Sequence, residues 1–341
     1  MPEPLLEVKG LKVRFTTEDG IVRAVDGVDF ELDRSKVLGI VGESGSGKSV
    51  TALSLLGLTR AHNTTFEGEV LYKGQDLLSM RESRLRDVRG NEIAMIFQDP
   101  MTSLNPVYRV GDQIVEAIVV HEKASKKIAR RRAIDLLGQV GLPNPERRVD
   151  DYPHEFSGGM RQRAMIAMAL SCNPDIVIAD EPTTALDVTI QAQILELLDK
   201  LRADFDSAVI LITHDLGVVA NVADDILVMY AGRIVERGAK RDIFYDPQMP
   251  YTWGLLGSIP RLDRPKPKKL HSITGSPPSL INLPRGCKFR PRCPHAFEKC
   301  QEEPDLRSRV EATDHLDRCW LGIDDKRKLR VTTIAGEAEV A

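Results

Sequence analysis

The chain has 341 residues, of which 42% are hydrophobic, enough for one large or two smaller cored domains. Its formal net charge is −3, so no general affinity for nucleic acid is expected. No basic stretch followed by an apolar one stands at the start, and no apolar run reaches the roughly 18 residues that span a bilayer. We therefore expect a soluble, cytoplasmic protein whose membrane role, if any, is carried by a partner.

The N-terminal segment predicts β-strands. Apolar residues recur from Leu5 to Phe15, Asp19-Gly20 is a turn signal, and residues 22–32 predict further strands. Phe15 ends the first strand, where an aromatic ring can stack on adenine. A place in the core explains Phe15 nearly as well.

A glycine-rich stretch, GESGSGKS, runs from Gly42 to Ser49, between an apolar run at 37–41 and a helix-like run at 50–56. Strand, loop and helix in this order match the phosphate loop G-x-x-x-x-G-K-[ST] better than a chance glycine-rich turn does. Its amides and the helix N-terminus favour an anion, Lys48 would reach the β- and γ-phosphates, and Ser49 would hold Mg²⁺. The predicted nucleotide ligands are Gly42, Ser44, Gly45, Ser46, Gly47, Lys48 and Ser49.

Further motifs follow predicted strands. Residues 68–76 form a short strand segment, and 92–97 form a buried strand that ends at Gln98, where a polar side chain can face a nucleotide. Two prolines predict that residues 99–106 are a loop. Ser125 can cap a helix that follows it. One face of this helix is basic, and a solvent-exposed basic face explains that charge run better than a binding site for an anionic partner does.

Ser157, Gly158 and Gly159 precede an amphipathic run at 160–170. This arrangement predicts a second helix N-terminus that can bind an anion, although an ordinary capped helix has the same pattern. Two such sites in one chain suggest that two copies, or a copy and a relative, enclose one nucleotide.

Two carboxylates end the buried strand at 175–181. Successive side chains of a strand point to opposite faces, so the two acids should have different roles. We expect Asp180 to hold Mg²⁺ and Glu181 to act as general base toward water. His214 follows the strand at 208–213, on the edge where open α/β sheets bind ligands.

The rest of the chain predicts a hairpin at 225–236, helix at 240–258 broken by prolines, and a connector rich in proline and lysine at 260–284. The expected domains are an ATPase at 1–238 with a helical part near 100–165, a helix and connector at 239–284, a cysteine-rich module at 285–322 and a tail at 323–341.

Four of the five cysteines gather near the C-terminus, whereas Cys172 fits a small buried hydrophobe. The four are Cys287, Cys293, Cys300 and Cys319. The absence of C-x-x-C weakens a zinc site, and four thiolates match a [4Fe–4S] cluster; Zn²⁺, bare thiols and disulfides stay open. Basic neighbours should lower the thiol pKa values. These neighbours are Arg285, Lys288, Arg290 and Arg292. The module lies far along the chain from the nucleotide motifs, which favours a structural role.

The ordered motifs, completed by Ala185-Leu186-Asp187, resemble those of the ATP-binding subunit of an ABC transporter. The resemblance implies an α/β fold, a P-loop ABC ATPase domain with a mixed sheet and a helical subdomain, followed by the small cysteine-rich C-terminal module. It also implies a head-to-tail dimer with a second ABC ATPase subunit. ATP with Mg²⁺ would lie between the phosphate loop of one subunit and Ser157, Gly158 and Gly159 of the other.

Residue roles are implied in the same way. Phe15 matches the adenine-stacking aromatic and Gln98 the glutamine that touches Mg²⁺ and senses the membrane partner. Glu181 matches the catalytic base, His214 the histidine at the γ-phosphate, and Asp187 the aspartate of the loop that crosses the dimer interface.

The C-terminal residues resemble the tail of oligopeptide and dipeptide importer ATPases. The matching segments are Gly275–Leu280, Pro284–Cys287, Pro291–Cys293, Cys300, His315 and Cys319. Phe156 and Met160 replace Leu and Gln of the common signature, as in that group. This implies uptake of short peptides, or of nickel or another small solute, through two integral-membrane permeases fed by an extracytoplasmic binding protein. The same resemblance implies an iron–sulfur cluster.

Two other functions stay open. One is a soluble ABC ATPase that acts on DNA or ribosomes, but neither a second cassette nor a long coiled coil is visible. The other is an iron–sulfur redox sensor that uses ATP binding as a switch. A transport motor accounts for more of the motifs.

Overall fold

The structure of the protein, a computed structural model, describes residues 3–184, 187–259, 273–308 and 314–335. The chain folds into two compact units that are each assembled from separate stretches. The first contains Met1–Leu5, Leu32–Val37 and Ser79–Ile212, and the second contains Leu6–Glu31, Leu38–Leu78 and Thr213–Ala341. Residues that are distant in sequence therefore share a unit.

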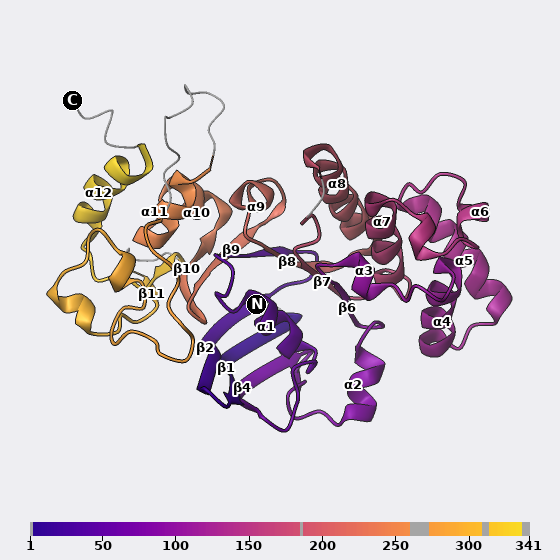
Figure 1. The fold of residues 1–341 in the computed structure, drawn as a ribbon, viewed down its shortest axis with the longest axis horizontal. Coiled ribbons are helices and arrows are strands. Elements are labelled where there is room, and N and C mark those ends of the chain that lie inside the picture. The colour runs from indigo at the N-terminus through magenta and orange to yellow at the C-terminus, as the bar shows by residue number, and fades with distance from the viewer. Residues whose placement is uncertain (1–2, 185–186, 260–272, 309–313, 336–341) are drawn as a thin grey trace. The chain divides into compact units, whose positions relative to one another are not determined.

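The second unit contains a four-stranded sheet in the order β2-β1-β4-β5 (Figure 1). Its strands are β1 (Leu6–Thr17), β2 (Gly20–Leu32), β4 (Thr64–Tyr72) and β5 (Gln75–Asp76). The strands predicted near 5–15 and 22–32 are confirmed, the latter as one continuous strand. β1 and β4 are antiparallel, and Phe15 lies opposite Thr64.

The same unit holds a second group of strands. They are β3 (Val37–Val41), β9 (Asp225–Tyr230), β10 (Arg233–Ala239), β11 (Arg307–Ser308) and β12 (Leu316–Asp317). β3 is parallel to β9, the predicted β9–β10 hairpin is confirmed, and β12 joins β10 antiparallel to it. A strand pair near the C-terminus thus extends the sheet that carries the glycine-rich loop.

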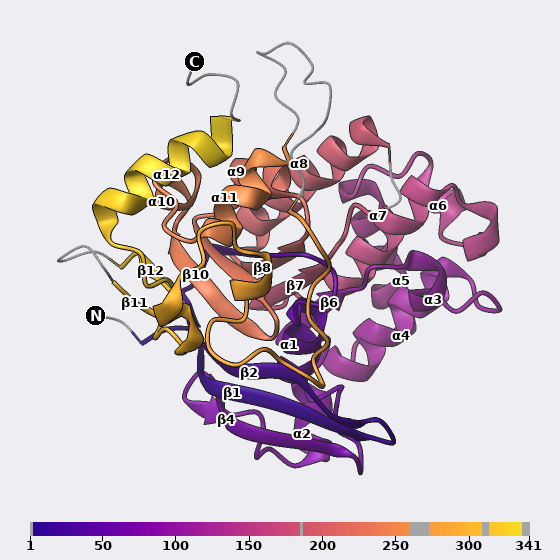
Figure 2. The same cartoon turned by 60° about the vertical axis from the view of Figure 1, so that its left-hand side comes forward.

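Helices of this unit follow its strands and fill its C-terminal part (Figure 2). They are α1 (Lys48–Leu55), α9 (Leu216–Val222), α10 (Lys240–Tyr245), α11 (Pro250–Gly257), η2 (Arg290–Arg292), η3 (Glu298–Gln301) and α12 (Ile323–Ala335). The predicted break at the prolines separates α10 from α11, because Pro250 takes the first turn of a new helix. Most of the predicted connector, residues 260–272, lies outside the described residues.

The first unit contains three parallel strands, β6 (Ile93–Ile96), β7 (Ile176–Asp180) and β8 (Ala208–Thr213). β7 and β8 are buried along their whole length, as their continuous apolar sequences predict. Helices make up the rest of the unit. They are α2 (Glu82–Val88), α3 (Pro100–Ser103), α4 (Val110–Glu122), α5 (Lys126–Gln139), α6 (Pro145–Arg148), η1 (Pro153–Glu155), α7 (Gly158–Ala169) and α8 (Val188–Phe205).

The prediction of a loop throughout 99–106 is wrong, because α3 occupies four of these positions. Pro100 stands at the start of the helix, where its missing N–H costs no hydrogen bond. Asp99 caps the turn, and its Oδ1 accepts a hydrogen bond from the Met101 N–H at 2.8 Å.

Ser125 caps α5 as predicted, since its hydroxyl accepts a hydrogen bond from the Ile128 N–H at 3.4 Å. Part of the basic face of α5 forms ion pairs within the unit. Arg130 lies 2.7 Å from Asp150 and Arg132 lies 2.6 Å from Glu122. Within the described ranges, no helix has both the length and the apolar character needed to cross a membrane.

Candidate functional site

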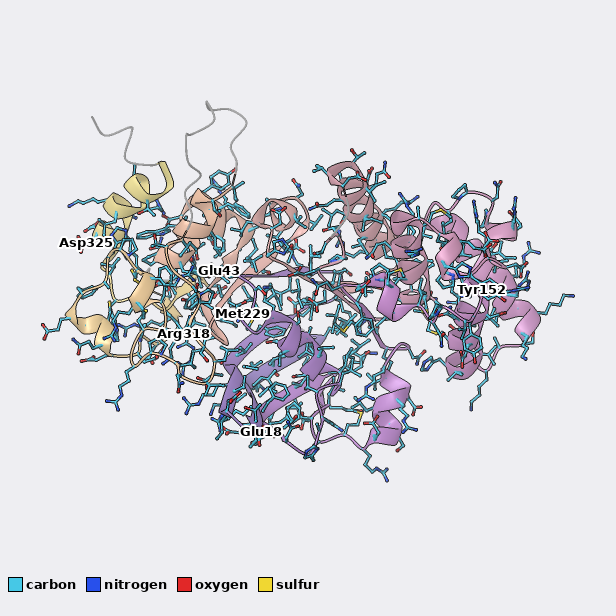
Figure 3. All side chains as sticks on the ribbon, viewed as in Figure 1. Glu18, Glu43, Tyr152, Met229, Arg318 and Asp325 are labelled. Carbon is cyan, nitrogen blue, oxygen red and sulfur yellow. The ribbon has the colours of Figure 1, made fainter. Side chains whose placement is uncertain are left out.

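The loop from Gly42 to Ser49 leads from the buried strand β3 into helix α1. Gly42 has φ 153°, and a Cβ there would lie 2.2 Å from the Met229 carbonyl oxygen. Met229 and Glu43, the residue after Gly42, are labelled in Figure 3. Gly47 has φ 101°, and its Cβ would lie 2.4 Å from the Ala24 carbonyl oxygen. Any other residue would have to displace backbone at either position, so glycine is required by both conformation and space.

Polar groups line this loop. The Lys48 side chain is buried, and its Nζ donates to the carbonyl oxygens of Gly42 at 2.7 Å and Glu43 at 3.0 Å. Ser46 is also buried, and its Oγ has no hydrogen-bond partner among the described residues. A buried ammonium and an unsatisfied hydroxyl beside a helix N-terminus fit phosphate oxygens, which accept hydrogen bonds and carry negative charge.

Two other predicted nucleotide residues belong to the same compact unit. Phe15 is half-buried near the end of β1. His214 is exposed directly after β8, and the next residue, Asp215, caps α9 by accepting a hydrogen bond from the Gly217 N–H at 2.7 Å. The cap anchors the turn that carries the imidazole.

The two acids at the end of β7 have different surroundings. Asp180 is only 5% exposed, whereas Glu181 lies at the strand tip and is half-buried. Glu181 has φ 47°, a backbone conformation that costs energy for a residue with a side chain. Its N–H donates to the Ile212 carbonyl at 2.9 Å, which holds the strained turn against β8.

The Glu181 carboxylate receives two hydrogen bonds from neutral groups. Gln98 Nε2 donates to Glu181 Oε2 at 3.3 Å, and Thr184 Oγ1 donates to the same oxygen at 2.9 Å. The structure therefore brings together two predicted site residues, Gln98 and Glu181, from different strands. Thr184 was missed by the sequence analysis, although its position three residues after the acid offers a local signal.

The second glycine motif also forms the start of a helix. Ser157 caps α7, and its hydroxyl accepts a hydrogen bond from the Met160 N–H at 3.4 Å. A Cβ on Gly159 would lie 3.2 Å from the Ile190 side chain, so helices α7 and α8 are close here. Asp187 is exposed and caps α8 through the Ile190 N–H at 3.0 Å. Ala185 and Leu186 lie outside the described residues.

All five cysteines are free thiols. Cys300 and Cys319 are each 8% exposed, and the Cys287 N–H donates to the Cys300 carbonyl at 3.0 Å. Nowhere in the described part of the chain do three or more His, Cys, Asp or Glu residues form a group able to hold a metal ion. The predicted four-cysteine metal module is therefore not shown.

The expected lowering of the thiol pKa values is wrong. Burial raises the pKa of Cys293 and of Cys319 to about 12, and it raises that of Cys287 as well. Two of the basic neighbours form ion pairs with carboxylates instead. Lys288 lies 2.8 Å from Glu303, and Arg292 binds Glu43.

Two family profiles match different parts of the chain. The sequence profile of the family described as ABC transporter matches residues 25–184. A second profile, described as oligopeptide/dipeptide transporter, C-terminal region, matches residues 235–300. The profiles cover the glycine-rich loop and the segment with the first three clustered cysteines, respectively.

Several curated relatives align over nearly the whole chain. The oligopeptide transport ATP-binding protein OppD of Bacillus subtilis is 54% identical over 95% of this chain and 91% of its own length. The dipeptide transport ATP-binding protein DppD of the same organism is 52% identical over 94% and 95%. OppD of Salmonella typhimurium is 53% identical over 90% and 92%.

Solved structures show the same fold in part of the chain. The dimeric post-hydrolysis state of the ATP-binding cassette MJ0796, bound to ADP and Pi, aligns with TM-score 0.62 and 27% identity. The alignment covers 69% of this chain and 99% of that one. The protein cbiO1 from Clostridium perfringens, part of the ABC transporter complex cbiONQ, aligns with TM-score 0.60 and 27% identity, over 72% and 92%.

Proposed function

Because the chain belongs to the ATP-binding subunits of oligopeptide and dipeptide ABC transporters, we propose that it hydrolyses ATP to drive peptide import. The observation that carries this proposal is the strand–loop–helix at Gly42–Ser49, in a chain whose relatives align over about nine-tenths of its length or more. The predicted P-loop ABC ATPase fold is confirmed.

The reaction is phosphoryl transfer from ATP to water. The loop amides and Lys48 bind the phosphates and offset their negative charge. This stabilises the transition state, in which negative charge develops on the leaving group. Ser49, Gln98 and Asp180 offer oxygen ligands of the kind that Mg²⁺ prefers. The ion would neutralise phosphate charge when bound.

Glu181 is assigned the role of general base. Its Oε2 accepts hydrogen bonds from Gln98 and Thr184, which orient the carboxylate for this role. His214 is assigned to the γ-phosphate and Phe15 to the adenine ring.

The partners follow from the transporter type. We assign two integral-membrane permeases, a second ATPase subunit and, indirectly, an extracytoplasmic solute-binding protein; no nucleic acid is involved. Ser157, Gly158, Gly159 and Asp187 serve the opposite subunit's nucleotide. The protein would lie at the cytoplasmic face of the membrane, held there by the permeases. Nickel or another small solute is the alternative cargo.

Purification of the whole transporter in detergent tests this function. We expect the chain to co-purify with two multi-span permeases and to split ATP faster when the binding protein carries a peptide. Co-purification with ribosomes instead, or stimulation by nickel and not by peptides, would assign the chain to one of the alternatives.

We also propose that Cys287, Cys293, Cys300 and Cys319 bind a metal centre, a [4Fe–4S] cluster in first place and Zn²⁺ as the alternative. The backbone hydrogen bond between Cys287 and Cys300 supports this, as do the electrostatic contributions of Cys287 and Cys300 to the raised pKa of Cys293. The thiols do not form a ligand set in this structure, so binding would draw them together.

Iron, sulfide and zinc analysis of anaerobically purified protein tests the metal proposal. We expect about four iron and four sulfide per chain, a content that Cys293→Ser abolishes. Cys172→Ser is the matched control, since that thiol lies outside the cluster, and should leave the content unchanged. Zinc in place of iron selects the alternative, and metal-free protein rejects both.

A further inference from the structure

The second residue of the phosphate loop, Glu43, is held by residues from the C-terminal part of the chain. Arg292 donates to both of its carboxylate oxygens, from Nη1 to Oε2 at 2.6 Å and from Nη2 to Oε1 at 2.9 Å. The Glu43 N–H donates to the Tyr251 hydroxyl at 2.8 Å, and its carbonyl accepts from Lys48 Nζ at 3.0 Å. The side chain, the N–H and the carbonyl of Glu43 are therefore all hydrogen-bonded.

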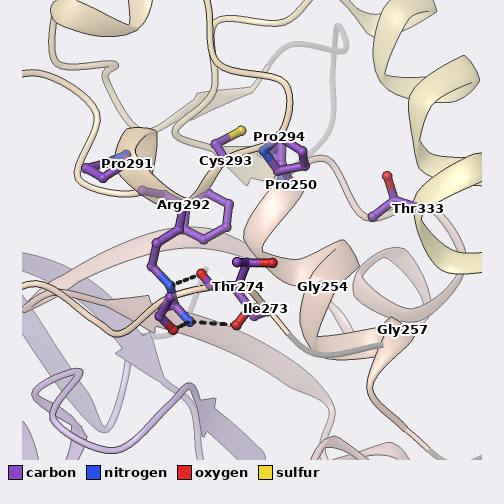
Figure 4. A pocket seen from close by; sticks show the side chains of 12 residues that line it. Pro250, Gly254, Gly257, Ile273, Thr274, Pro291, Arg292, Cys293, Pro294 and Thr333 are labelled. Atoms are coloured by element: carbon purple, nitrogen blue, oxygen red, sulfur yellow. Dashed lines mark hydrogen bonds between the residues drawn. The ribbon is translucent and has the colours of Figure 1, made fainter. Parts of the chain in front are cut away.

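Arg292 is itself fixed. Its side chain is 4% exposed, and Nε donates to the Thr274 carbonyl at 3.0 Å, as Figure 4 shows. Nη2 also donates to the carbonyls of Gly275 at 3.2 Å and Ile273 at 3.4 Å. A planar guanidinium with this many fixed partners has little freedom to move.

Three buried aromatic rings support the contact. Tyr230 ends β9, Tyr251 lies in α11, and Phe289 precedes η2; their ring centroids are 4.6 to 5.4 Å apart. The Arg292 guanidinium lies 5.8 Å from the centre of the Tyr230 ring. The phosphate loop, helix α11 and the cysteine-rich segment thus share one packed cluster within one compact unit.

A pocket of about 410 Å³ is lined in part by residues of this cluster (Figure 4). Arg292, Phe289 and Cys293 line it together with Gly254 of α11 and Ile273. Arg292 therefore connects the surroundings of Cys293 with the phosphate loop.

A phosphate loop binds best when its amides already point at the anion, because ordering them on binding costs affinity. An unpaired carboxylate on the loop would also repel the triphosphate. Arg292 removes both costs, since it fixes Glu43 and neutralises its charge.

We propose that Arg292 is a positioning residue for ATP binding: it holds Glu43 so that the phosphate loop is formed before the nucleotide arrives. ATP affinity thereby depends on the folded state of the cysteine-rich segment. The inference rests on the proposed assignment of the Gly42–Ser49 loop to the ATP phosphates.

Nucleotide titration of the full-length chain, combined with steady-state ATPase kinetics of the assembled transporter, tests this role. Arg292→Ala should raise the ATP dissociation constant and KM about tenfold, while kcat changes by less than about twofold. Arg292→Lys keeps the charge without the paired hydrogen bonds and should give an intermediate value. The double variant Glu43→Ala/Arg292→Ala should be no worse than Arg292→Ala, because the two side chains act as a unit.

Arg330→Ala is the matched control, since it removes an arginine–carboxylate pair with Asp246 that includes no phosphate-loop residue. It should leave KM unchanged. A purely structural role for Arg292 would lower the melting temperature and the active fraction, with KM unchanged. If Arg292→Ala does not fold, Arg292→Lys and Glu43→Gln carry the same test. Unchanged KM in folded Arg292 variants overturns the proposal if Lys48→Ala still weakens ATP binding by about 10²-fold. Intact binding in Lys48→Ala would instead overturn the assignment of the loop.

Discussion

Glu43 in the phosphate loop and Glu181 at the tip of β7 are both carboxylates beside predicted nucleotide motifs, yet their surroundings differ. Glu43 is paired with a buried arginine at 2.6 and 2.9 Å. Glu181 accepts hydrogen bonds from an amide at 3.3 Å and a hydroxyl at 2.9 Å, on a backbone with φ 47°. Arg292 holds both oxygens of Glu43, whereas Gln98 and Thr184 both donate to a single oxygen of Glu181. The first arrangement suits a residue that keeps the loop in shape, and the second orients the carboxylate for the general-base role proposed for it.

The sharpest way to break this comparison is to neutralise the second carboxylate. Glu181→Gln should lower turnover by about 10³-fold, because the general base is lost, while ATP affinity stays within about twofold of the unchanged protein. Single-turnover hydrolysis and nucleotide titration measure the two quantities. Turnover that survives in Glu181→Gln would move the base elsewhere.

Removing the lysine of the phosphate loop should instead act mainly on ATP affinity. Lys48→Ala should raise the ATP dissociation constant by about 10²-fold, because it deletes the charged group that faces the phosphates. Fluorescent nucleotide titration measures it. Lys73→Ala, at an exposed lysine of the same compact unit, is the control and should bind ATP normally.

A smaller effect tests how Glu181 is oriented. Thr184→Val keeps the side-chain shape but removes the hydroxyl donor, so kcat should fall about tenfold with KM nearly unchanged. Thr184→Ser retains a hydroxyl and should restore most of kcat. Normal kcat in Thr184→Val with a loss in Thr184→Ser would show that the methyl group, and not the hydrogen bond, matters.

The smallest predicted effect concerns the stability that the hydrogen bond between His315 and Glu236 gives to the C-terminal part of the chain. Burial, the largest single cause, lowers the pKa of His315, but the hydrogen bond at 2.8 Å to the buried Glu236 and the charges of Glu236, Asp242 and Asp317 together raise it above its usual value. When the histidine pKa is higher in the folded state, the resulting stabilisation is complete at pH values below the unfolded-state pKa of about 6.5. This stabilisation is lost as the pH rises through the folded-state pKa.

Thermal unfolding as a function of pH checks this sign. The melting temperature of the unchanged protein should contain a component that falls over that range, and His315→Gln should lack it. His62→Gln, at an exposed histidine, is the control and should keep it. A component that rises with pH would contradict the assigned sign.

Local patterns were enough for most of the secondary structure. Continuous apolar runs predicted β3, β7 and β8, because strands buried on both faces have no polar side. The local error was at α3, where two prolines were taken to exclude a helix although one of them starts it. Cap residues such as Ser125 and Ser157 were found because a cap is a short-range interaction.

Local signals carried the predictions of site residues. The loop at Gly42–Ser49 and the acids at the end of β7 were proposed from such signals, whereas Thr184 was missed and Arg292 was expected to serve the cysteines. Arg292 lies 249 positions from Glu43, and four basic residues stand close together in its segment. Nothing in the sequence says which of them turns away from the thiols.

By itself, the sequence determined the strands, the caps and the glycine-rich loop, because each depends on residues within a few positions of one another. Only the tertiary structure decided that the cysteine-rich segment shares a compact unit with the phosphate loop and that Arg292 pairs with Glu43. The reason is physical: burial and long-range packing choose a charge's partner, and the choice leaves no periodic or local trace in the chain.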